Sequence, residues 1–202
     1  GGKFGPFENQ IFLGDYTLSI ILRVTTEQVN GVWQGACYPF REGLSTGIMH
    51  VEFSPRGQLI VGGFTTNRQW PVRGTEPFAI QRIDWSGVVP FEIREINIRK
   101  DGFLVTFTKP VDRDIASSTD AYTVTTYTHN YAAGYGSPEV DHTTPEVIRA
   151  VPSADGLSVM VHLDKTTEGH IHDFDLAGMV SRDGERLLHT KAYYTVNEIP
   201  DH

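Results

Sequence analysis

The chain has 202 residues, of which 39% are apolar and 21% are charged. This length and composition suffice to bury a core in one or two domains, and they exclude a disordered tail. The formal net charge is −8, and lysines and arginines are scattered along the chain, so nucleic acid is not an expected partner. No apolar run reaches the roughly 18 to 20 residues that cross a bilayer, so no membrane span is expected.

Residues 1–89 are predicted to form short strands separated by Gly, Pro and Asn, because no stretch shows helical periodicity. The tetrad Ser54-Pro55-Arg56-Gly57 predicts a chain reversal, since Pro presets φ at the second turn position and Gly accepts a positive φ. Strands are expected at residues 11–15, 19–24, 47–53, 58–63 and 78–85.

Cys37 is the only cysteine, which excludes an internal disulfide framework and any multi-cysteine metal site. It lies among apolar neighbours in residues 33–40, where a buried, unreactive thiol is the expected state.

Two successive sets of short antiparallel strands are typical of propeller blades. A propeller needs at least about four blades, and residues 1–89 encode fewer than two. We therefore expect this segment either to wrap onto the following domain or to pack against upstream blades or a partner chain. On a propeller, Asp15, Arg23 and Arg82 would line the upper, ligand-binding surface, the alternative being salt-linked turns.

From residue 90 onward the strand alternation is cleaner, and turns recur every 8 to 12 residues or so. This spacing predicts a β-sandwich over residues 90–202, with a long loop at 129–142. The expected fold is all-β: partial propeller-like blades followed by an Ig-like β-sandwich. In the polar connection after residue 108, Asp112 and Asp114 are expected to be solvated carboxylates, with calcium binding as the alternative.

Several strings in the second half resemble bacterial Ig-like domains of the surface-layer type. They are FLVTFTKPVDRD from Phe103 with the YTV that follows, IRAVPSADGLSVMVHL from Ile148, EGHIHDFDL from Glu168 and VSRDGERLL from Val180. The resemblance covers most of residues 91–198 and implies a fold rather than an activity.

The first half resembles the last blades of large secreted bacterial proteins whose propeller is similar to soluble glucose/sorbosone dehydrogenases. The strings are GGKFGPFENQIFLGD, NGVWQGACYPF and FAIQRIDWSGVVPFEI, and SPEVDHTTP and LLHTKAYYTVNEIP resemble the C-terminal region of the same proteins. The resemblance implies an extracytoplasmic location, with quinone and calcium held by the parent protein. No Cys-x-x-Cys-His haem motif occurs, and no catalytic residue of that family can be assigned here.

His170 and His172 are two residues apart, so on a strand both imidazoles face the same side, at a spacing that can hold one metal ion. His142 or Asp141 would complete a three-ligand site for zinc or copper. The alternative is a polar, wet face of an edge strand.

Tyr127, Tyr131 and Tyr135, with Asn130 and Glu139 nearby, have the composition of a sugar-stacking platform. The alternative is that the tyrosines lie on the sandwich and anchor their loop.

The leading hypothesis is a non-catalytic accessory module of a secreted, dehydrogenase-like protein, with a loop that contacts a partner or a glycan. The rivals are part of a quinone-dependent sugar oxidoreductase using Asp15, Arg23 or Arg82, and a metal-binding module using His170 and His172. No nucleophile-elbow, metalloprotease or phosphate-loop motif occurs. The accessory module predicts unpaired strand edges and an exposed apolar face within residues 1–89.

Overall fold

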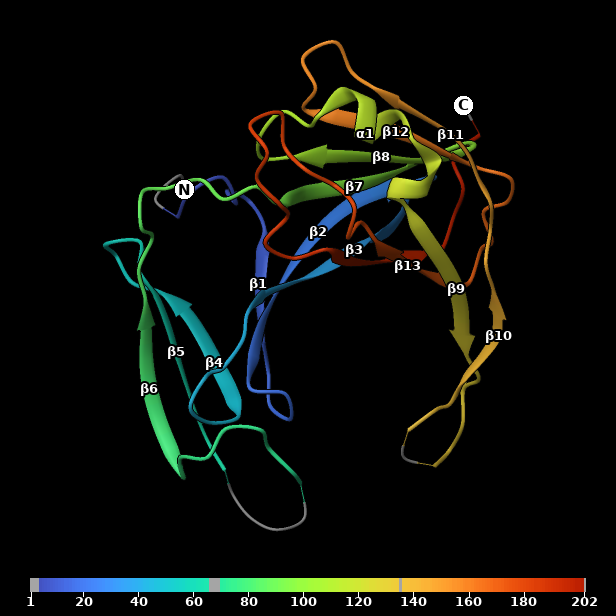
Figure 1. Ribbon diagram of the computed structural model, residues 1–202. Helices are drawn as coiled ribbons and strands as arrows, with labels where there is room; N and C mark the ends of the chain where they lie inside the picture. The colour runs from blue at the N-terminus through green and yellow to red at the C-terminus, as the bar shows by residue number, and fades with distance from the viewer. Residues whose placement is uncertain (1–3, 66–69, 135, 202) are drawn as a thin grey trace. The chain divides into compact units, whose positions relative to one another are not determined.

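The structure, a computed structural model, describes residues 4–65, 70–134 and 136–201. Nearly all regular elements in these ranges are β-strands, arranged in three open antiparallel sheets (Figure 1). The all-β class predicted from the sequence is confirmed. None of the helices in the described ranges is long and apolar enough to cross a membrane.

The chain divides into two compact units. The first consists of Gly1–Val24 and Cys37–Val89, and the second of Thr25–Ala36 and Pro90–His202. Residues 25–36 were predicted to be part of the first segment, 1–89. They belong to the second unit because two long strands run from one unit into the other.

The first unit is built from antiparallel β-strands. Its strands are β1 (Ile11–Asp15), β2 (Ile20–Val29), β3 (Val32–Arg41), β4 (Ile48–Phe53), β5 (Leu59–Phe64) and β6 (Phe78–Ile83), and β4, β5 and β6 form a three-stranded sheet of their own. The turn between β4 and β5 is the one that the tetrad predicts. Gly57 has a φ of 84°, and its N–H donates to the Ser54 carbonyl at 2.9 Å.

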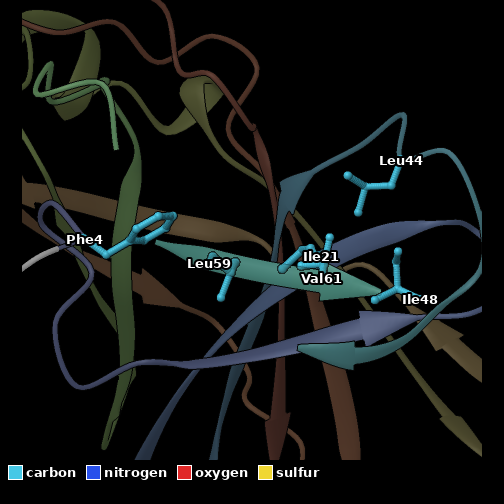
Figure 2. Packing of buried hydrophobic residues seen from close by; sticks show 6 residues of the cluster. All are labelled: Phe4, Ile21, Leu44, Ile48, Leu59 and Val61. Carbon is cyan, nitrogen blue, oxygen red and sulfur yellow. The ribbon is translucent and has the colours of Figure 1, made fainter. Parts of the chain in front are cut away.

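One face of the β4–β5–β6 sheet forms the core of the first unit. Alternation along β5 sends Leu59 and Val61 to the same side, where they pack against Ile21 of β2 (Figure 2). The whole buried cluster is Phe4, Ile21, Leu44, Ile48, Leu59 and Val61. Each such side chain contributes about 1.5 to 3 kcal/mol when it leaves water. The first unit is therefore held together from this inner face of the sheet.

The second unit is a β-sandwich. One layer comes from the seven-stranded sheet, whose order is β1, β2, β3, β14 (Lys191–Val196), β13 (His170–Asp175), β9 (Thr123–His129) and β10 (Glu139–Thr143). The other has the order β11 (Val147–Pro152), β12 (Ser158–Leu163), β8 (Gly102–Phe107) and β7 (Ile93–Arg99). Phe103 of β8 joins the two layers, since its ring lies about 5 Å from the rings of His172, Phe174 and Tyr194.

Two short helices, α1 (Arg113–Ser117) and η1 (Thr119–Ala121), follow β8. Asp112 is the N-cap of α1, because its carboxylate accepts from the backbone N–H groups of Asp114 and Ile115. The Asp112 carboxylate is thus used by the backbone.

The structure differs from the predicted strand pattern at two places. Residues 139–142, expected in a loop, are part of β10, which pairs with β9 through an irregular register. Asp141 has a φ of 57° at this irregularity, which breaks the alternation that identifies a strand. Strand β3 was not predicted because Gly35 and Pro39 lie within it.

Candidate interaction surface

The outer face of the β4–β5–β6 sheet, opposite the core, carries large apolar side chains. The register pairs Phe64 with Phe78, Gly62 with Ile80 and Ile60 with Arg82, and all six residues have the parity of this outer face. Phe78 is 76% exposed and Ile80 is 83% exposed. The sheet is thus apolar on both faces, whereas only its inner face is covered by the core of the first unit.

This apolar surface continues beyond β6. Met49, at the bulge of β4, is 60% exposed, and Met49, Phe64, Trp70 and Tyr16 line a shallow pocket of about 380 Å³. We call Met49, Ile60, Phe64, Trp70, Phe78 and Ile80 the outer apolar face. Single exposed apolar residues are ordinary, whereas several on one face of a sheet are unusual in a soluble domain.

Strand β6 is the edge of its sheet (Figure 1). The N–H of Thr65 donates to the Pro77 carbonyl, so this pair and the alternate pairs after it turn their backbone groups toward β5. The backbone groups of Phe78, Ile80 and Arg82 therefore point to the other side, where no strand among the described residues pairs with them. Such an edge is a template for another strand.

The charged groups on this face are paired with each other. Arg82 Nε lies 2.9 Å from the Asp84 carboxylate, and His50 lies 3.4 Å from Glu52. The first unit as a whole has seven basic and six acidic residues, whereas the second has ten basic and nineteen acidic residues. The net negative charge of the chain thus belongs to the second unit, and the outer apolar face lies on the nearly neutral one.

The three residues predicted for a quinone pocket have different roles. The Asp15 carboxylate accepts from the N–H of Leu18 at 2.6 Å and closes the turn between β1 and β2. Arg82 lies on the outer face with Asp84. Arg23 is buried in the first unit, as described next.

The Arg23 guanidinium lies between two aromatic rings, 4.5 Å from the Phe7 centroid and 4.4 Å from the Tyr38 centroid. It donates to the side-chain oxygen of Gln10 at 2.7 Å. A buried cation between two rings gains from each ring's quadrupole, so this arrangement stabilises the fold of the first unit.

A groove of about 390 Å³ opens beside this cluster, lined by Phe4, Phe7, Phe12 and Phe53 and by the polar stretch 8–10. Neither Asp15 nor Arg82 lines it. The structure therefore does not bring the three predicted residues together around this groove.

The histidines predicted as metal ligands each contact different residues. His170 and His172 share the inward face of β13, and His170 Nε2 lies 3.0 Å from the Asp141 carboxylate. His172 is fully buried against Phe103, and burial lowers its pKa from 6.5 to about 4.

His142 has other neighbours. It lies 3.7 Å from the Glu139 carboxylate and stacks on Tyr127, with a ring separation of 5.6 Å. Within residues 4–65, 70–134 and 136–201, no group of three His, Cys, Asp or Glu side chains is arranged to hold a metal ion. The predicted three-ligand site is therefore not formed by these residues.

The tyrosines expected to bind sugar are likewise not gathered into one platform. The Tyr127 ring contacts His129 as well as His142, and its pKa is raised by burial and by the nearby carboxylate of Glu139. Tyr131 is fully exposed beyond the end of β9. Tyr135 lies outside the described residues.

The strands that carry the outer apolar face were predicted, but its residues were not predicted as a site. The available signal is in residues 78–83, where Phe78 and Ile80 alternate with Ala79 and Ile83, so that both faces of the strand are apolar. An edge strand with two apolar faces indicates a second contact beyond the core.

No family model matches the chain, and no curated protein matches it. A solved structure of surface layer protein SbsC, domains 1-6, is similar to this chain with a TM-score of 0.42 and 21% sequence identity. The similarity covers 56% of this chain and 14% of that chain. It assigns no function to the present protein.

Proposed function

We propose that this chain is a non-catalytic structural module of an extracytoplasmic protein and that it docks on another protein surface through the outer apolar face. In this proposal the sandwich is an Ig-like domain of the surface-layer type, and the first unit belongs with propeller-type blades of a dehydrogenase-like protein. The quinone and its calcium ion would be held by that larger protein.

The observation that carries the proposal is the asymmetry of the β4–β5–β6 sheet. Its inner face is covered by the first unit's own core, but Met49, Phe78 and Ile80 on the outer side remain largely exposed. Burying a side chain of this size contributes about 1.5 to 3 kcal/mol, so three of them provide a strong drive toward a partner. Arg82 and Asp84 beside them form an ion pair, so docking over these residues does not isolate either charge.

Hydroxyl-radical footprinting tests this proposal on the protein in its native assembly and on the purified chain. Met49 and Trp70 are expected to be protected in the assembly and reactive in the purified chain, because docking removes them from water. Trp33, an exposed residue of the second unit, is the control that should react in both. Equal reactivity of Met49 and Trp70 in the two samples would overturn the proposal.

A pair of variants gives a second test in the native assembly. Met49→Asp puts a charge on the outer apolar face and should release the chain from the assembly. Ile148→Asp changes an exposed apolar residue of β11 in the second unit and should leave the chain bound. Retention of both variants would show that docking uses another surface.

A second candidate function is glycan contact at the connection between β9 and β10, which the full exposure of Tyr131 favours. An exposed ring can stack on the apolar face of a sugar. Tyr131→Ala should then abolish binding on a polysaccharide panel, while Tyr127→Phe, which keeps its ring, should retain it.

A further inference from the structure

We infer that the free edge of β6 pairs with β6 of a second copy of this chain, antiparallel and about a twofold axis at Ala79. This inference rests on the proposed function, because it names one partner of the same sheet. It concerns the backbone edge, whereas the docking proposed above concerns the side chains of the outer face.

Alternate N–H and C=O groups of β6 are oriented to pair with such a strand. Phe78, Ile80 and Arg82 turn their N–H and C=O groups to the free edge, as the register with β5 requires. Pro77, which has no N–H, turns its carbonyl toward β5 and so removes no donor from the free edge. An extended strand can therefore pair with the edge from Phe78 to Arg82.

The side chains select one register. With Ala79 on the axis, Phe78 lies opposite Ile80 of the second copy. Glu76 precedes β6 and its N–H donates to the Ser45 carbonyl, so it would meet Arg82 of the second copy through its side chain alone. Centring the pair on Ile80 would place Phe78 opposite Arg82 and Glu76 opposite Asp84, which repel each other. Centring it on Phe78 would place Glu76 opposite Ile80. Only the register at Ala79 pairs apolar with apolar and acid with base.

The resulting interface is isologous, as a twofold axis demands. It contains two Phe78–Ile80 pairs across the axis and, at each end, Glu76 joined to the exposed Arg82–Asp84 pair. The near balance of charge in the first unit lets two copies approach through these units, although the chain as a whole is acidic. Met49, Phe64 and Trp70 stay on the outer face, available to the docking partner.

Sedimentation velocity over a range of concentrations tests the inference. The wild-type chain should shift from a species of 22.5 kDa to one of twice that mass as concentration rises. Glu76→Arg and Arg82→Glu should each raise the dimer Kd by about tenfold or more, since two symmetric charge pairs become repulsive. The double variant Glu76→Arg/Arg82→Glu restores opposite charges and should return the Kd toward the wild-type value.

Ile80→Pro provides a test that does not depend on charge. The Ile80 N–H points to the free edge, so proline there removes a donor of the new pair and leaves the β5 ladder intact. Its far-ultraviolet circular dichroism should match the wild type, and its dimer should be lost. Unchanged dimerisation of Ile80→Pro, or failure of the charge swap to restore the dimer, would overturn the register.

The inference and the proposed function fail in different ways. A wild-type chain that stays monomeric, with Met49 and Trp70 still protected in the native assembly, would overturn pairing with a second copy and leave docking in place. A dimer whose Met49 and Trp70 react equally in the assembly and in the purified chain would support the pairing and overturn docking.

Discussion

Phe64 of β5 and Phe78 of β6 are direct cross-strand partners, and both lie on the face of the sheet that the core does not cover. Two residues along β5, Gly62 lies opposite Ile80 on the same face. The sheet thus has two apolar faces with different neighbours, which predicts that neighbouring residues on opposite faces respond differently to substitution.

Ile48 and Met49 provide the first comparison. Ile48→Ala should lower the free energy of unfolding by about 2 to 5 kcal/mol, because Ile48 is buried in the inner cluster and its truncation leaves a cavity. Met49→Ala should change it by less than about 0.5 kcal/mol, because its side chain is mostly in water. Urea unfolding measures both values, and a large loss for Met49→Ala would show that the outer face contributes to the fold.

Gly62 and Gly63 provide the second comparison, within two residues of β5. A Cβ added at Gly63 would lie 1.8 Å from the Gly47 carbonyl oxygen, which forces β4 and β5 apart. At Gly62 the nearest atom would be 3.6 Å away, an ordinary contact. Gly63→Ala should therefore be destabilising by several kcal/mol, and Gly62→Ala should be neutral or slightly stabilising, by about 0.5 kcal/mol. Thermal unfolding distinguishes them, and similar melting temperatures would contradict this prediction.

The strands and turns of the first unit could largely be predicted from the sequence, because their signals are local. The tetrad at 54–57 turns the chain by its own φ preferences, and the apolar alternation of Leu59 and Val61 identifies a buried face. Strand β3 could not be found in this way. Gly35 is required there because a Cβ would meet the Thr25 carbonyl oxygen of the neighbouring strand, and that contact is not local.

The candidate sites could not be predicted as well as the strands. Which side chains meet depends on the order of strands in the sheets, and the periodicity of the sequence does not give that order. His170 and His172 were expected to face the same side, and they do. Their chemistry follows from the position of β13 between β14 and β9, which puts His172 in the core of the sandwich. Likewise, the pattern Phe78-Ala79-Ile80 shows two apolar faces but does not say which one the core covers.

Cys37 should react slowly with thiol reagents in the folded protein. Burial raises the pKa of its thiol, and the nearby Arg23 cation only partly opposes this effect, so little thiolate is present at pH 8. The rate of iodoacetamide alkylation should rise strongly in urea. Cys37→Ser/Ser86→Cys moves the thiol to an exposed position and should react as fast folded as unfolded. Fast alkylation of folded wild type would show that the thiol is accessible.

His172 should make the folded state sensitive to acid. Its imidazole lies against Phe103 in the core, where burial favours the neutral form and lowers the pKa to about 4. In the unfolded chain the pKa returns to about 6.5, so between these values the unfolded state binds a proton that the folded state does not. Stability should therefore fall as the pH drops from about 6.5 to about 4, and this contribution should level off below that range.

A difference of about 2.5 pKa units corresponds to a loss of about 3 kcal/mol across this range. His172→Gln isolates that loss, because the amide retains a polar side chain but does not titrate. Urea unfolding from pH 7.5 to pH 4 should show the wild type losing about 3 kcal/mol more than His172→Gln, whatever the variant costs at neutral pH. Parallel curves for the two proteins would mean that the pKa of His172 is the same in the folded and unfolded states, which would contradict the burial of its imidazole against Phe103.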